Sequence, residues 1–243
     1  MVLLAADTST TRGSVALKVP DSKVMERDLP EGLPHSETLL PAIQELLAAS
    51  GLGPKDVTAL AVGVGPGAFT GLRVGLSTFK GLAFTSRLPL APVPSLDAVA
   101  YPLLLEGRKA LVAADARKGE LYAACYSGIT PEGLPARDCD VALITHHAFS
   151  QFCLRCPAGK RIVAGTGLAM IKGMVDSIPF LAPAGDDMAY PRASFVMEIG
   201  QKMLDLGRSV TPSELFPFYV RPPDATPYRE AAGPASGNSP GRK

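Results

Sequence analysis

The sequence contains no hydrophobic run long enough to cross a membrane, since none approaches the roughly 18 consecutive apolar residues that a spanning helix needs. It also has almost no net charge, because 24 lysines and arginines face 23 aspartates and glutamates. No overall field therefore draws the chain to a nucleic acid or a membrane surface. Neither a basic segment nor a small-residue cleavage site precedes the first apolar run, residues 2–6, which argues against secretion. We expect a cytoplasmic protein.

Histidine is scarce, and the short motifs of several enzyme classes are missing. The chain has three histidines and neither an H-E-x-x-H nor a G-x-S-x-G motif, so a metallopeptidase or a serine hydrolase is disfavoured. No Gly-Lys-Ser/Thr sequence ends the glycine-rich stretch at 63–73, which excludes a Walker A phosphate loop. That stretch also differs from a dinucleotide fingerprint: it follows a later strand, Pro66 lacks an amide, and no acidic residue lies about 20 positions further on.

The four cysteines include one C-x-x-C pair, Cys153 and Cys156, which follows two adjacent histidines. Structural zinc uses such ligands, but it commonly takes two pairs from separate elements. Residues 146–156 follow a helical period with Thr145 as the N-cap, and this period places both thiols on an apolar stripe. We therefore expect both cysteines to act as small hydrophobic side chains rather than as metal ligands.

One pattern occurs twice in the chain. Near the start, an apolar run ends at Asp7, and the chain resumes after a Ser/Thr-rich turn as the alternating stretch 14–19. Near the middle, a second apolar run ends at Asp115 and resumes after a shorter turn as the stretch 121–126. Two hairpins of one design, each opening half of the chain, indicate a duplicated α/β unit.

The segments after each hairpin extend the repeat. Strand, helix, strand and helix patterns follow at 24–29, 38–50, 58–64 and 70–86 in the first half, and at 139–143, 146–156, 161–164 and 168–176 in the second. A further helical segment closes each half, at 96–105 and at 192–206. The sequence therefore predicts an α/β fold of two related βββαβα subdomains, residues 1–107 and 108–228, with the last helix able to pack back on the first subdomain. A tail at 229–243, rich in Gly, Pro, Ala and Ser, is expected to be disordered.

The glycine-rich stretch opens a predicted helix that contains further glycines, although each interior glycine costs about 1 kcal/mol relative to alanine. Gly71 and Gly75 stand one turn apart and form a shallow groove. The groove is flanked by Leu72, Val74 and Phe79. Small side chains let another backbone approach closely, and two interpretations remain open: packing against the chain's own sheet, or contact with another subunit.

Four runs of sequence carry a resemblance to a known family. They are GPGAFTGLR at 65–73, DTST at 7–10, DARKGELY at 115–122 and YVRPP at 219–223. Together they resemble the TsaB family, also called YeaZ, in a match that runs in order from about residue 2 to about residue 225. That family belongs to the bacterial machinery that makes threonylcarbamoyladenosine (t6A) at position 37 of tRNAs. The resemblance implies a duplicated actin-like, Hsp70-like fold (ASKHA, Gcp-like), in agreement with the repeat.

The resemblance also implies where a nucleotide site would lie. In the superfamily, the first hairpin wraps the phosphates of ATP, and its aspartate lies near the metal. Asp7, Thr8, Ser9 and Thr10, together with Asp115 in the second hairpin, are therefore candidates for a vestigial nucleotide site. The polarity of a hairpin turn would explain these residues equally well.

The same resemblance argues against catalysis by this chain. The related catalytic subunit, TsaD, binds an iron-type metal through an H-x-x-x-H pair on its first helix. Here the corresponding positions are His35 and Leu39, and a single histidine cannot hold a catalytic metal. A second phosphate loop is not evident, since residues 165–167 suit a strand-to-helix turn. We expect no catalytic residue, no metal and no cofactor of its own, with any ATP or ADP bound at the partner interface.

The function implied by the resemblance is that of a non-catalytic partner of TsaD that acts with TsaE. Their reaction transfers threonylcarbamoyl from its adenylate to N6 of adenosine 37 in tRNAs that read codons beginning with A. The chain would meet tRNA only through the complex, and alone it would pair with a second copy. Two other classes stay open: an ATP-dependent phosphotransferase of the same superfold that uses Asp7 and Asp115, and a metallopeptidase-like protein.

In this family the partner contact is formed by the two helices of the first subdomain. Apolar residues cover more of the first helix than one buried face needs, so an outward apolar stripe is expected. Pro41 leaves its orientation open, because the helix either starts near Thr38 or bends at the proline. The interface residues expected from the two helices are Leu39, Leu40, Ile43, Leu46, Leu47, Phe69, Thr70, Gly71, Leu72, Val74, Gly75 and Phe79.

Overall fold

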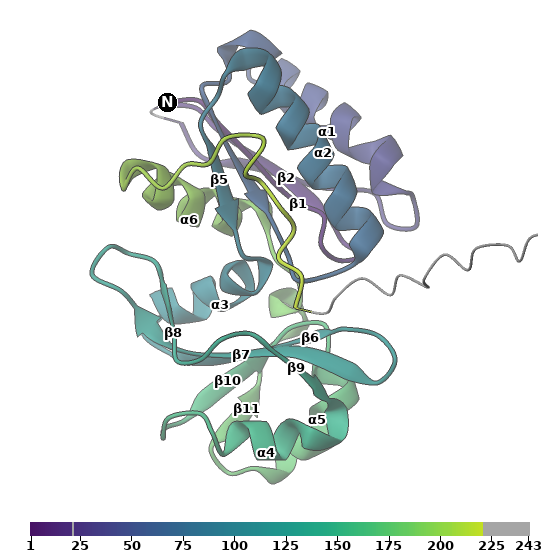
Figure 1. Ribbon diagram of the computed structural model, residues 1–243, viewed down its shortest axis with the longest axis vertical. Helices are drawn as coiled ribbons and strands as arrows, with labels where there is room; N and C mark the ends of the chain where they lie inside the picture. Colours follow the sequence, from purple (N-terminus) through teal and green to yellow (C-terminus); the bar gives the residue numbers. More distant parts are fainter. Residues whose placement is uncertain (21, 221–243) are drawn as a thin grey trace, which may run out of the picture.

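The two predicted hairpins lie in two separate mixed sheets, one in each half of the molecule (Figure 1). The computed structural model describes residues 1–20 and 22–220. The tail predicted at 229–243, and residues 221–228 at the end of the predicted second subdomain, lie outside the described residues.

The first sheet has the strand order β3-β2-β1-β4-β5. Its strands are β1 (Leu3–Asp7), β2 (Ser14–Lys18), β3 (Met25–Asp28), β4 (Ala59–Gly63) and β5 (Leu90–Val93). β1 runs antiparallel to β2 and parallel to β4. Both β1 and β4 are buried along their whole length, because helices cover both faces of the sheet, and this explains their unbroken apolar sequences.

The second sheet repeats this arrangement, with the order β11-β10-β6-β7-β8 and with β9 also paired to β7. Its strands are β6 (Lys109–Asp115), β7 (Glu120–Ile129), β8 (Pro135–Arg137), β9 (Ala142–Thr145), β10 (Arg161–Ala164) and β11 (Leu181–Pro183). β6 runs antiparallel to β7 and parallel to β10, as β1 does to β2 and β4. The duplicated α/β fold predicted from the repeat is confirmed.

Helices cover both sheets and fill the space between them (Figure 1). They are α1 (His35–Ala49), α2 (Phe69–Ser86), α3 (Ser95–Leu105), α4 (Phe149–Cys153), α5 (Leu168–Ser177) and α6 (Ala193–Asp205). α1 and α2 pack on the outer face of the first sheet, and α4 and α5 pack on the outer face of the second. α3 and α6 lie between the two halves. Among the described residues, no helix has the length and apolar content of a membrane span.

α6 follows the second sheet in sequence but packs on the first. Its apolar residues Val196, Met197 and Ile199 lie in one buried cluster with residues of β1 and β4. The start of the helix is fixed by a hydrogen bond of 2.8 Å from the Ala193 amide to Ser14 Oγ of β2. The described residues after α6 stay with the first subdomain, where the Phe218 amide bonds the carbonyl of Val64 (2.8 Å), and Tyr219 lines the cleft between the halves.

Two predicted helices differ from the structure. α1 begins at His35 rather than at residue 38, and Pro41 lies inside it. Residues 146–156 form a 3-10 turn, His146–Ala148, followed by the short α4, and Thr145 makes no side-chain cap. The apolar period of that segment is real, but α4 ends at Cys153, where the chain turns toward β7.

This turn brings together two cysteines that the sequence did not pair. Cys156 forms a disulfide with Cys125 of β7, so its predicted role as a simple hydrophobic side chain was wrong. Cys153 is a buried thiol as predicted, and burial raises its pKa to about 11. All four cysteines, including Cys139, lie in the cluster between the second sheet and α4–α5.

Candidate functional site

Asp7 ends β1 as a fully buried carboxylate that the protein itself satisfies. Its Oδ1 accepts hydrogen bonds from the Ser9 amide (2.7 Å) and from Ser9 Oγ (2.6 Å). Its Oδ2 accepts one from Ser95 Oγ (2.6 Å), at the start of α3. Gly63 makes room for this carboxylate, because a Cβ there would overlap Asp7 Oδ2. Asp7 therefore ties the first hairpin to β4 and α3, and its oxygens do not face a ligand.

The hydroxyl-rich turn after Asp7 is packed beneath α2. Thr8 is buried, and its Oγ1 donates a hydrogen bond of 2.8 Å to the carbonyl of Gly71. A Cβ at Gly71 or at Gly75 would overlap an oxygen of Thr8, either the backbone carbonyl or Oγ1. The glycine groove of α2 is thus filled by the chain's own hairpin, which decides between the two interpretations left open by the sequence. Thr10 stays near the surface, where its Oγ1 bonds the carbonyl of Arg12 (2.6 Å).

Burial raises the pKa of Asp7 above its ordinary value of 3.8, although the serine hydrogen bonds oppose the shift. The Asp7 carboxyl group therefore binds its proton more tightly in the native state than in the unfolded chain. The free energy of unfolding falls as the pH rises from about 4 through the raised pKa. This fall amounts to about 1.4 kcal/mol for each unit by which the pKa is raised, and we expect Asp7→Asn to abolish it. Urea denaturation between pH 4 and pH 7 measures it, with the exposed Asp205→Asn as control. Parallel pH profiles for the two variants would contradict the buried-acid interpretation.

His35 lies where the resemblance placed a metal ligand, but its surroundings are those of a structural residue. Its Nε2 donates a hydrogen bond of 2.8 Å to the carbonyl of Thr10. Leu39, at the second ligand position, is buried in the first subdomain's core. Among the described residues, no group of three or more His, Cys, Asp or Glu side chains could hold a metal ion.

A cleft of about 820 Å³ separates the turns of the two hairpins. It is lined by residues 9–11, 66–69 and Arg73 of the first subdomain, by 114–118, Tyr122 and Thr166 of the second, and by Tyr190 and Tyr219. The N-terminal end of α2 faces this cleft, and its N-cap, Ala68, provides no side-chain cap. The positive end of the helix dipole is therefore directed into the cleft.

Asp115 occupies the position in the second hairpin that Asp7 has in the first, but it faces the cleft. Its Oδ1 accepts a hydrogen bond of 2.7 Å from the Arg117 amide, and its own amide donates to Thr166 Oγ1 (3.0 Å). The two halves of the repeat have therefore diverged: one aspartate is sealed in the fold, and the other is at the surface.

Most of the predicted interface residues are buried in the chain's own core, which corrects the sequence-based set. Buried are Leu39, Ile43, Leu46, Leu47, Gly71, Leu72, Gly75 and Phe79. Leu40 (49% exposed), Phe69 (42%) and Thr70 are exposed, and Val74 is half-buried. The packing of α1 against the first sheet sets this orientation, with Leu39 turned inward and Leu40 outward.

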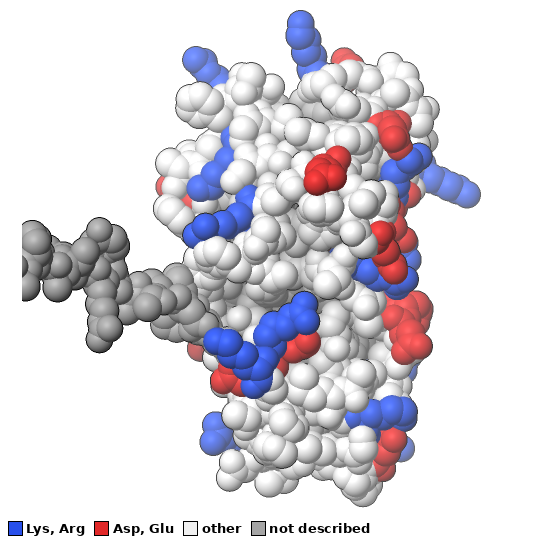
Figure 2. Space-filling model, turned by 90° about the vertical axis from the view of Figure 1, so that its right-hand side faces the viewer, with Lys and Arg blue, Asp and Glu red and all other residues white. Residues whose placement is uncertain are grey.

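One exposed aromatic residue of this face was missed. Phe84 is 79% exposed, and it lies about four turns after Thr70, near the same line along α2. Its period relative to Thr70 and Val74 could have identified it. Leu40, Thr70, Val74 and Phe84 are called the α1–α2 face below, whereas Phe69 lines the cleft. Figure 2 shows that charged side chains are sparse over the part of the surface that α1 and α2 form.

Comparisons with known proteins agree with this architecture. The TsaD family model, described as tRNA N6-adenosine threonylcarbamoyltransferase, matches residues 32–133. The tRNA threonylcarbamoyladenosine biosynthesis protein TsaB of Haemophilus influenzae is 32% identical over 91% of this chain and 94% of its own length. The TsaB of Escherichia coli is 30% identical over 91% of this chain and 95% of its own. The solved structure of YeaZ from Pseudomonas aeruginosa superimposes with a TM-score of 0.74 and 28% identity, covering 90% of this chain and 99% of that one. The chain belongs to the TsaB (YeaZ) family of tRNA threonylcarbamoyladenosine biosynthesis proteins.

Proposed function

We propose that this chain is the non-catalytic partner of TsaD in t6A biosynthesis, acting in the cytoplasm together with TsaE. The reaction it supports is threonylcarbamoyl transfer to N6 of adenosine 37 in tRNAs that read codons beginning with A. The observation that carries the proposal is a fold of this family whose first hairpin is sealed while its α1–α2 face is left open to solvent.

The sealed hairpin supports the non-catalytic role. The carboxylate of Asp7 has its oxygens occupied by Ser9 and Ser95, and Leu39 stands where a second imidazole would be needed. Neither group can position a phosphate or a metal without rearrangement of the core. In this proposal the chain has no metal or cofactor of its own, and any ATP or ADP of the complex is bound at the boundary with TsaD. A phosphotransferase that relies on Asp7 gains no support from this geometry.

The α1–α2 face supports the partner role. Large apolar side chains that stay exposed in a row mark a protein contact more often than scattered ones do. Phe84, 79% exposed, is an aromatic anchor of the kind that dominates binding energy at interfaces. We propose that TsaD covers this face, and that a second copy of the chain covers it when TsaD is absent.

Reconstitution of the modification tests the proposal. Purified TsaD, TsaE, ATP, the enzyme that forms threonylcarbamoyl-adenylate and an unmodified tRNA are combined with and without this chain, and t6A is measured by mass spectrometry of nucleosides. Product that depends on the chain supports an obligate partner. Product that forms equally well without it would overturn the proposal.

The surface is tested by Phe84→Glu and Leu40→Glu, each of which places a charge on the α1–α2 face. We expect each substitution to lower the affinity for TsaD by about tenfold or more, because it would replace a buried anchor with an unpaired carboxylate. The matched control is Leu154→Glu, which changes an exposed leucine (78%) of the second subdomain. Affinity is measured by surface plasmon resonance, and unfolding by urea verifies that each variant is folded. If all three variants bind TsaD equally well, another surface forms the contact.

A further inference from the structure

Cationic side chains from both subdomains line the cleft between the hairpins. Among the described residues that line it are Arg73 of the first subdomain and Arg117 of the second, together with the carboxylate Asp115. Among the described residues, no carboxylate forms an ion pair with Arg73. Arg117 is 71% exposed, and its guanidinium lies 3.8 Å from Asp115, a surface pairing that contributes little in water. Both walls therefore present cations to the cleft, and Figure 2 shows Lys and Arg side chains where the two halves of the molecule meet.

The second hairpin holds its two cations in an unfavourable backbone conformation. Arg117 has φ = 65° and Lys118 has φ = 53°, and both values lie in the left-handed region. Side chains with a Cβ adopt this region at a cost, and glycine or asparagine is the usual choice. The turn thus holds Arg117 at the edge of the cleft in a conformation that costs free energy.

The first wall adds a stack of flat groups. The Arg73 guanidinium lies 3.7 Å from the centre of the Phe69 ring, and that ring lies 5.9 Å from the ring of Tyr219. Phe69 and Tyr219 are both about 40% exposed, so the stack has open faces in the cleft. We call these three residues the aromatic ladder. Aromatic rings and arginine planes are the surfaces on which unpaired nucleic-acid bases stack.

The groups of the first hairpin that would hold a nucleoside triphosphate are not free in this cleft. The Ser9 amide, which could have cradled a phosphate, is bonded to Asp7, and Pro66 has no amide to offer. Asp7 is fully buried and does not line the cleft, so the carboxylate of the first hairpin is not available to a magnesium ion there. What the cleft offers is separated cations and stacking faces, which suit a strand better than a compact triphosphate.

We propose that this cleft binds an unpaired segment of RNA, with phosphates on Arg73 and Arg117 and a base against the aromatic ladder. A volume of about 820 Å³ lies within the range of sites that enclose small ligands, enough for part of a strand. The inference rests on the proposed role in t6A biosynthesis, where it makes this chain part of the surface that holds the tRNA.

The test uses the assembled complex with TsaD and a fluorescein-labelled, unmodified tRNA, and measures affinity by fluorescence anisotropy over a series of salt concentrations. Log affinity falls as log salt concentration rises, and Arg117→Gln is expected to make this fall less steep by about 0.7, the value for one contact to a single-stranded phosphate. Tyr219→Leu is expected to weaken binding about tenfold at every salt concentration without a change of slope. The control is Arg155→Gln, an exposed arginine of the second subdomain that does not line the cleft.

Neither Arg117 nor Tyr219 belongs to the α1–α2 face, so both variants are expected to assemble with TsaD. Assembly of the complex is measured separately by size-exclusion chromatography. A complex that assembles and binds tRNA equally well with Arg117→Gln, Tyr219→Leu and Arg155→Gln would overturn this inference and leave the proposed function standing. A chain that does not assemble with TsaD overturns the proposed function, and the same salt series on the chain alone then decides the inference. Micromolar binding of ADP to the isolated chain, weakened by Arg117→Gln, would assign the cleft to a free nucleotide and overturn the RNA proposal.

Discussion

Replacing Gly71 with alanine is expected to lower the free energy of unfolding by about 3 kcal/mol. Gly71 lies in the first turn of α2, and a Cβ there would overlap the backbone carbonyl oxygen of Thr8, which has no rotamer to move into. The same close approach carries the hydrogen bond of 2.8 Å from Thr8 Oγ1 to the carbonyl of Gly71. Separating α2 from the hairpin therefore loses packing and a buried hydrogen bond together.

Gly81→Ala is the matched control, because it makes the same change in the same helix. Gly81 is exposed, and a Cβ there meets nothing within 4 Å. It is expected to raise the free energy of unfolding by up to about 1 kcal/mol, since alanine favours the helix. Urea denaturation followed by far-UV circular dichroism suits a chain without tryptophan. Two changes of the same sign and size would show that helix propensity, rather than the approach of the hairpin, determines both.

The duplicated fold could be predicted because its signal is local. The first strand of each hairpin is an apolar run that ends at an aspartate. These runs are continuous because both faces of each strand are buried. The outward face of α1 could not be predicted in the same way. Leucines occupy neighbouring positions such as Leu39 and Leu40, and only the packing of the helix against the sheet decides which one is buried.

The candidate site was predicted by residue type but not by partner. Asp7 and Ser9 stand two positions apart, so their hydrogen bonds were within reach of sequence reasoning. Ser95 closes the same network from 88 positions away, and no local pattern indicates that contact. The disulfide from Cys125 to Cys156 could not be predicted for the same reason, since it joins a strand to a loop 31 residues later. The short motifs identified Asp7 and Cys156, but only contacts with residues far away in the sequence determine the partner of each side chain.

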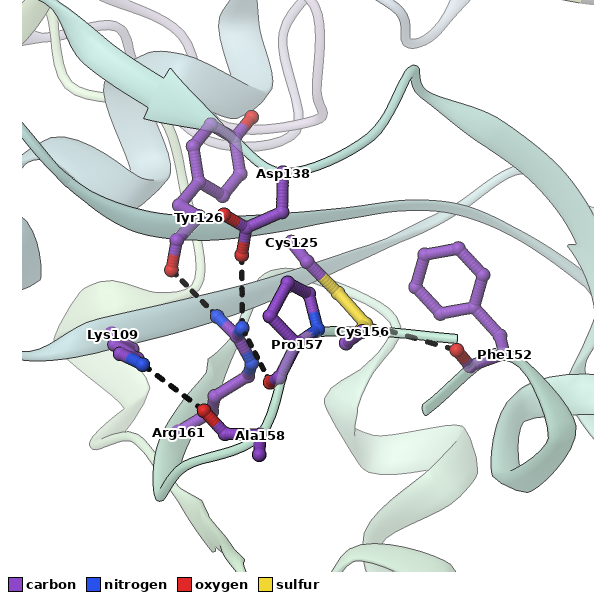
Figure 3. A network of polar contacts seen from close by, with 9 residues as sticks. All are labelled: Lys109, Cys125, Tyr126, Asp138, Phe152, Cys156, Pro157, Ala158 and Arg161. Atoms are coloured by element: carbon purple, nitrogen blue, oxygen red, sulfur yellow. Dashed lines mark hydrogen bonds and ion pairs between the residues drawn. A yellow bond between two sulfur atoms is a disulfide. The ribbon is translucent and has the colours of Figure 1, made fainter. Parts of the chain in front are cut away.

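Close to that disulfide, Arg161 is a buried cation that no sequence pattern indicated (Figure 3). Its Nη1 donates to the carbonyl of Tyr126 (2.7 Å), and its Nη2 donates to Asp138 and to the carbonyl of Pro157, each at 2.9 Å. The guanidinium thereby connects β10 to β7 and to the loop that carries Cys156. Its Nε has no partner among the described residues, so the arrangement is not fully satisfied.

Arg161→Met is expected to cost about 3–5 kcal/mol, because it leaves the Asp138 carboxylate, 9% exposed, without its cation. Adding Asp138→Leu is expected to recover most of that loss, since apolar groups of similar volume can replace a buried ion pair at little cost. The control is Lys172→Met, which breaks an exposed pair with Asp176 and should cost less than about 1 kcal/mol. Urea denaturation of the two single variants and the double variant closes the cycle, with thiols counted so that the disulfide is equally formed in each. A loss that persists in the double variant would mean that the hydrogen bonds to Tyr126 and Pro157, rather than the charge of Asp138, are what Arg161 contributes.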